Sequence, residues 1–177
     1  MILYIIGDDM LYFGIVIIVF VGVLTVILCQ NYNKLVLLSN KADEVKTRID
    51  KEIDERFKLA DTFTQVIQNI VDANATNAIK TLVGRYGVSD DSDSFKYYID
   101  LTNILNSIET SLTAAGVTQY PLPEWYKTFH DNAAKVEALR LEYNEAALRV
   151  NTIMHSAPNN IMAMICRFKK KIIFPQI

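Results

Sequence analysis

Helix breakers, cysteine and histidine are scarce in this 177-residue chain. It has only 6 glycines and 4 prolines. A chain with so few breakers favours an all-helical fold. The two cysteines, Cys29 and Cys166, have neither another cysteine nor a histidine nearby at ligand spacing. The sequence therefore indicates no disulfide framework and no zinc site. A net charge of −2 provides no overall field that would attract nucleic acid.

Charge is also absent from a long stretch near the N-terminus, because no charged residue lies between Asp9 and Lys34. The centre of this stretch, LYFGIVIIVFVGVLTVIL, is almost wholly aliphatic and aromatic. Roughly 20 helical residues cross a hydrocarbon core of about 30 Å, so the stretch predicts a transmembrane helix over residues 10–30. The alternative is a buried core helix, but such helices rarely lack charge over this length.

The flanks of this stretch predict an uncleaved anchor and its orientation. Residues 1–9 contain no Lys or Arg, and large side chains precede Cys29, which makes a poor signal-peptide or lipoprotein cleavage site. Basic residues follow the stretch at positions 34, 41, 46 and 48. This bias predicts a single-pass cell-membrane protein with residues 1–9 outside and the helical domain in the cytoplasm.

Apolar residues at steps of three and four predict helices in the rest of the chain. The predicted helices span residues 10–58, 61–85, 95–114 and 123–156. We expect an antiparallel four-helix bundle over residues 31–157 with coiled-coil-like packing, in which Tyr143 and Val150 belong to the core. The acidic loop GVSDDSDS lacks the central Gly and the distal Glu of a calcium loop and is expected to be solvated.

The sequence contains no recognisable catalytic motif. HExxH, the phosphate-binding GxxxxGK[ST] loop, GxSxG and CxxC are all absent. Di-iron bundles use Glu-x-x-His pairs, and this pairing does not occur either. We therefore predict a protein that is not an enzyme and that uses no cofactor and no metal.

The last predicted helix carries an unusual polar stripe beside its apolar one. Five residues fall within about a 60° arc at the helical period of roughly 100° per residue. They are Glu137, Arg140, Asn144, Asn151 and His155. One interpretation is a boundary network in which Arg140 pairs with a carboxylate of the first or second helix. The other is a groove that recognises a peptide or another helix.

The C-terminal tail, residues 158–177, mixes apolar and basic side chains. Its positive cluster consists of Arg167, Lys169, Lys170 and Lys171. Such a segment can contact the anionic cytoplasmic surface of a membrane. The alternative, which the sequence leaves open, is that the apolar side chains pack on the bundle.

Two stretches resemble the LemA family. The first is YNKLVLLSNKADEVKTRIDKEIDERFKLAD, and the second is RLEYNEAALRVNTIMHSAPNNIMA, preceded by Tyr120 and Pro121. The paired Tyr-Asn and Asn-Thr motifs of the second stretch stand at the family's spacing. The chain departs from the family where Glu55 replaces an Arg, Lys58 an Asp and Ala133 a Glu. A role of those family residues is therefore not carried over to this chain.

The resemblance implies a membrane-anchored antiparallel bundle with a short outer N-terminus and no established catalytic activity. Similar proteins are linked to membrane organisation. We therefore expect a scaffold or interaction protein whose partners are the lipid bilayer and other proteins. A second copy of the chain is a further possible partner, and nucleic acid is not expected to be one. The alternative is a membrane-tethered sensor or adaptor that binds a small ligand or peptide and regulates a neighbouring membrane protein. A ligand-sized pocket lined by the polar stripe would favour the alternative.

Overall fold

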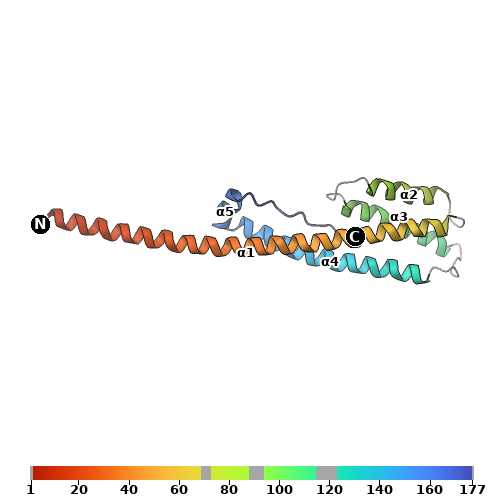
Figure 1. Ribbon diagram of the computed structural model, residues 1–177, viewed down its shortest axis with the longest axis horizontal. Helices are drawn as coiled ribbons and strands as arrows, with labels where there is room; N and C mark the ends of the chain where they lie inside the picture. The colour runs from red at the N-terminus through yellow and green to blue at the C-terminus, as the bar shows by residue number, and fades with distance from the viewer. Residues whose placement is uncertain (1, 69–72, 88–93, 115–122, 177) are drawn as a thin grey trace. The chain divides into compact units, whose positions relative to one another are not determined.

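The computed structural model describes residues 2–68, 73–87, 94–114 and 123–176, and its regular elements there are all α-helices (Figure 1). The helices are α1 (Ile2–Ile67), α2 (Ala73–Tyr86), α3 (Ser94–Ala114), α4 (Pro123–His155) and α5 (Asn159–Ile165). The predicted all-α class is confirmed, and the bounds of α3 and α4 agree with the predicted ranges within one residue. Much of the predicted acidic loop, residues 88–93, lies outside the described residues.

The predicted break between the first two helices is wrong, because α1 continues through Asp61 to Ile67. The buried stripe carries on across that point with Phe57, Ala60 and Phe63, while Asp61 itself is exposed. No Gly or Pro interrupts this part of the chain. An Asp on the exposed face of a helix lowers helix stability only slightly, so the burial of the apolar stripe keeps α1 continuous through Asp61.

The N-terminal part of α1 carries the apolar stretch. Every large apolar side chain from Leu11 to Ile27 is exposed. By length and composition this part of the helix is able to cross a membrane, a property that it shares with signal sequences.

The chain divides into two compact units, and both α1 and α4 contribute to each. The first unit comprises Met1–Ala42 and Ala146–Ile172. Its core joins Leu35 of α1 to Val150 of α4 and to Met162 and Ala163 of α5. Further apolar residues packed against this core are Leu28, Leu38, Ile153, Met154 and Phe168. Val150 is thus a core residue, as its place in the α4 stripe predicts.

Helix α5, which the sequence does not predict, ends in a paired backbone motif. The Arg167 amide donates to the Met164 carbonyl at 3.2 Å, and the Phe168 amide donates to the Ala163 carbonyl at 3.0 Å. These are the two hydrogen bonds of a Schellman motif, which needs a left-handed residue after the last helical turn. Arg167 fills that position with a φ of 56°. The motif ends the helical part of the region after α4, and the non-helical segment that follows, residues 168–176, is called the tail from here on.

The second unit comprises Asp43–Glu145 and Ile173–Ile177. Helix α2 packs on α3. The spacing of apolar residues in α3 predicts a buried seam of Tyr98, Leu101, Leu105, Ile108 and Leu112. The first four are buried, whereas Leu112, near the end of the helix, is only half-buried. In α4, Val136 and Tyr143 are buried, so the predicted core position of Tyr143 is confirmed. Arg48 of α1 pairs with Glu142 while Arg56 contacts Phe129, so in this unit α1 and α4 run antiparallel.

Candidate functional site

Asn144 of α4 holds the backbone of the C-terminal tail through both ends of its side-chain amide. Its Nδ2 donates to the Phe174 carbonyl at 2.8 Å, and its Oδ1 accepts from the Phe174 amide at 2.9 Å. Together the two bonds satisfy one complete peptide residue that would otherwise need water. An asparagine placed in this way binds main-chain groups and does not discriminate between side chains.

The side chain of Phe174 fills a slot between two aromatic rings of the second unit. Its ring stacks on Phe95 of α3 with centroids 4.3 Å apart and on Tyr143 of α4 at 4.7 Å. Stacked aromatic pairs at such distances contribute roughly 1 kcal/mol each beyond area burial. The slot therefore adds selectivity for an aromatic residue to the backbone contact that Asn144 makes.

Asn151 makes the same kind of contact within the first unit. Its Nδ2 donates to the Lys171 carbonyl and its Oδ1 accepts from the Lys171 amide, both at 2.9 Å. The two asparagines are seven residues apart on α4, and their targets are three residues apart on the tail.

Arg140 does not make the predicted ion pair with the first or second helix. Its partner is Glu137, one turn earlier on α4, with Nε and Nη2 donating to the two carboxylate oxygens at 2.7 and 2.6 Å. In the described residues no carboxylate of α1 or α2 pairs with it. The spacing of three residues along a helix makes the local pair possible without any tertiary contact. The remaining Nη1 donates to the Phe174 carbonyl at 3.3 Å.

The same pairing perturbs both pKa values. The hydrogen bond from Arg140 lowers the pKa of Glu137, and the bond to Glu137 raises the pKa of Arg140. A carboxyl with a lowered pKa stabilises the folded state above its ordinary titration range, and that contribution is lost as the pH falls through the lowered pKa. The carboxylate of Glu137 thus keeps Arg140 in position for the Phe174 carbonyl at neutral pH.

The polar stripe is therefore partly a binding surface for the chain's own tail. Arg140, Asn144 and Asn151 contact tail backbone, and Glu137 orients Arg140. His155 is exposed at the end of α4 and makes no hydrogen bond to the tail within the described residues. In the basic cluster, Lys171 is half-buried, whereas Arg167, Lys169 and Lys170 are exposed.

The second unit also contains a buried arginine that the sequence pattern does not reveal. Arg56 of α1 is 1% exposed, and its guanidinium lies 3.5 Å from the centroid of the Phe129 ring. Nη1 donates to the Phe129 carbonyl at 3.0 Å and to Asn132 Oδ1 at 3.5 Å, while Nε has no partner within the described structure. Desolvation lowers the pKa of Arg56 to about 10, so it remains charged at neutral pH.

We predict that Arg56→Met leaves the free energy of unfolding unchanged or raises it by about 1 kcal/mol. The reason is that burial disfavours the charged form, and in the described residues no carboxylate pairs with the guanidinium. Thermal melts of the purified chain test this, with Arg56→Ala as the variant that leaves a cavity and should be destabilised. Equal destabilisation of the Met variant would show that the ring and carbonyl contacts outweigh the desolvation.

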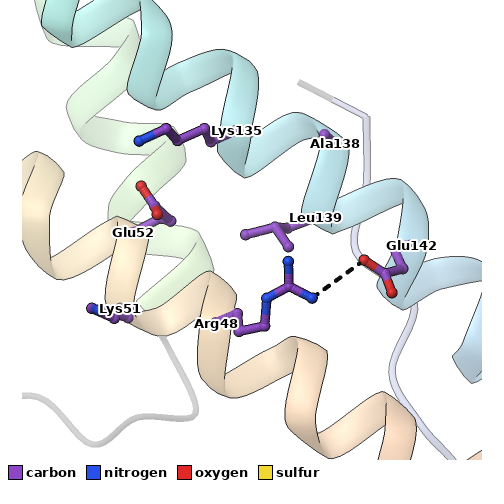
Figure 2. Close-up of a pocket in the computed structure, with 7 residues that line it drawn as sticks. All are labelled: Arg48, Lys51, Glu52, Lys135, Ala138, Leu139 and Glu142. Carbon is purple, nitrogen blue, oxygen red and sulfur yellow. Dashed lines mark ion pairs between the residues drawn. The ribbon is translucent and has the colours of Figure 1, made fainter.

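A shallow pocket of about 410 Å³ lies between α1 and α4 in the second unit (Figure 2). It is lined by Arg48, Lys51, Glu52, Lys135, Ala138, Leu139 and Glu142. Arg48 and Glu142 form an ion pair across it at 3.6 Å. None of the five residues of the polar stripe lines this pocket, so it is not the ligand site that the sensor interpretation requires. A second pocket of about 560 Å³ lies between α2 and α3, and no residue of the stripe lines it either.

Within the described ranges, no group of three or more His, Cys, Asp and Glu residues is placed to hold a metal ion. A scan against models of protein families finds no match, and comparisons with curated proteins and with solved structures find none either. The resemblance to the LemA family therefore stays a prediction.

Proposed function

We propose that this protein is a non-enzymatic scaffold or interaction protein, anchored in the cell membrane by α1 and similar in architecture to the LemA family. In this proposal the helices after the span form an antiparallel four-helix bundle. The observation that carries the proposal is the uninterrupted passage of α1 from an exposed apolar stretch into a packed stripe that begins at Leu35. Because the helix is continuous, a partner that binds the packed part of α1 is held at a fixed distance from the bilayer.

Orientation follows from the basic residues that flank the span. Lys34, Lys41, Lys46 and Arg48 follow it, and no Lys or Arg precedes it. Basic residues near the end of a span are retained on the cytoplasmic side. The proposed topology has the N-terminus outside and the packed helices in the cytoplasm.

We predict that Cys166 is inaccessible from outside the cell. In a Cys29→Ser variant Cys166 is the only thiol, and its side chain is exposed in the structure. A membrane-impermeant maleimide should leave intact cells unlabelled and label the protein after permeabilisation, with denatured samples as the measure of complete labelling. Labelling in intact cells would reverse the topology, and partners would then have to be sought outside.

A second candidate function is an adaptor for extended peptides. The observation that favours it is the way in which Asn144 and Asn151 bind main-chain groups of the tail. Recognition through backbone hydrogen bonds plus one side-chain slot is a common mode of peptide binding. Site-specific crosslinking in native membranes distinguishes the two functions. Partners captured from positions on α4 beside the tail favour the adaptor, and partners captured only from α2 or α3 favour the scaffold.

A further inference from the structure

Helix α5 presents an apolar face that nothing in the described structure covers. Ile161, Met164 and Ile165 are 57%, 73% and 71% exposed. Their spacing of three and four residues places them on one side of the helix. The opposite side, Met162 and Ala163, is buried against Leu35 and Val150. Helix α5 therefore has apolar residues on both its buried and its exposed side, whereas the exposed side of a soluble surface helix is polar.

The packing of the first unit fixes where along α1 this face lies. The partly buried residues of α1 that pack against the core holding α5 are Leu28, which is the last residue of the aliphatic stretch, and Leu38. Phe168, three residues after the last residue of α5, makes an edge-on ring contact with Tyr32 at 6.0 Å between centroids. Tyrosine is enriched where a span leaves the hydrocarbon. Helix α5 is thus held beside the part of α1 that leaves the membrane.

The charges around α5 all have one sign. No Asp or Glu occurs from Ala146 to the end of the chain, and none occurs from residue 10 to Ala42. The first unit is basic in these two segments, with Lys34, Lys41, Arg149, Arg167, Lys169, Lys170 and Lys171. Several basic residues immediately cytoplasmic of a span are attracted to anionic headgroups.

We propose that α5 and the start of the tail lie in the headgroup region of an anionic membrane leaflet. The three exposed apolar side chains enter the boundary with the acyl chains, and Arg167, Lys169 and Lys170 bind headgroup phosphates or carboxylates. This proposal rests on the proposed membrane anchor, which brings α5 to the surface. The tail beyond Lys171 takes no part, because its backbone is held by α4.

The test uses the full chain with Cys29→Ser and an environment-sensitive fluorophore on Cys166, which follows α5 directly and is exposed. The protein is reconstituted in vesicles of phosphatidylcholine alone or with added phosphatidylserine. Lipids that carry a nitroxide near the top of the acyl chain should quench the fluorophore strongly in the anionic vesicles. A fluorophore at Ser107→Cys, on an exposed position of α3, should remain unquenched.

Two sets of variants separate the apolar and the charged contributions. Replacing Ile161, Met164 and Ile165 by Ser should abolish quenching without lowering Tm, because these side chains are exposed. Replacing Arg167, Lys169 and Lys170 by Gln should weaken the docking of α5 by about fivefold per residue and remove its dependence on phosphatidylserine and on salt. Unchanged quenching in both sets would overturn the proposal.

The outcome for α5 is separable from the outcome for the anchor. Protein released from the vesicles by alkaline carbonate would contradict the anchor. Protein that is retained but has an unquenched fluorophore on Cys166 would contradict the α5 contact alone. The fluorophore on Cys166 could instead be shielded to a degree that rises with the number of protein molecules per vesicle and does not depend on lipid charge. That result would show that a second copy covers α5, and it would equally overturn the proposal.

Discussion

Replacing Val150 by Asp is expected to lower the free energy of unfolding by about 4 kcal/mol or more. Val150 is 0% exposed and lies in the core that joins α1, α4 and α5 in the first unit. A carboxylate there would have no basic partner among its core neighbours, which are Leu35, Met162 and Ala163. In a chain of this size such a loss corresponds to a fall in Tm of roughly 10 °C.

The matched control is Leu148→Asp. Leu148 lies on the same helix two residues earlier but is 60% exposed. A surface substitution of this kind usually changes stability by no more than about 0.5 kcal/mol. Circular dichroism melts of the detergent-solubilised chain compare the two variants. If both melt like the parent protein, the packing face of α4 is wrongly assigned.

The core of α4 could be predicted from the sequence because its period decides which residues face inward. Val136, Tyr143 and Val150 recur at intervals of seven residues, and all three are buried. The seam of α3 follows the same rule. Long stripes with many repeats tolerate local irregularity, so their buried faces can be identified without knowledge of the partner helix.

Two features of the fold depend on tertiary packing and could not be predicted. The polar residue Asp61 and its neighbour Thr62 suggest a helix start, but the buried stripe through Ala60 and Phe63 keeps α1 continuous. Helix α5 has only seven residues, which is too short to be stable alone. Its existence depends on Met162 and Ala163 packing in the core of the first unit, a contact with no local signal.

Of the two parts of the candidate site, only the α4 residues could be predicted from the sequence, and the tail that they bind could not. The spacing of Arg140, Asn144 and Asn151 identifies a polar stripe, but it does not identify the tail as the partner. An asparagine that binds an amide and a carbonyl requires no particular side chain opposite, so the tail carries no complementary pattern. Only Phe174, as an aromatic residue, could have suggested the slot beside Tyr143. The burial of Arg56 could not be predicted for a similar reason, since it contacts a backbone carbonyl, the Asn132 side-chain oxygen and two aromatic rings, and no carboxylate in the described residues.

Replacing Asn144 and Asn151 together by Leu is expected to release the tail and to speed tryptic cleavage after Lys171 at least about tenfold. The double variant loses four hydrogen bonds to the backbone of Lys171 and Phe174. Each such bond contributes about 0.5–1.5 kcal/mol net, and tenfold corresponds to only about 1.4 kcal/mol. Cleavage requires the bound segment to open first, so its rate follows the population of the released tail.

The measurement is mass spectrometry of fragments from the detergent-solubilised full chain, where no lipid shields the tail. Cleavage after Arg85, which is exposed on α2, serves as the internal reference for unfolding elsewhere. Asn103→Leu, an exposed asparagine on α3, is the matched control and should leave both rates unchanged. If the double variant is cleaved after Lys171 no faster than this control, the asparagines do not hold the tail. Phe174→Ala would then be expected to release it instead, because the ring contacts with Phe95 and Tyr143 would be the remaining attachment.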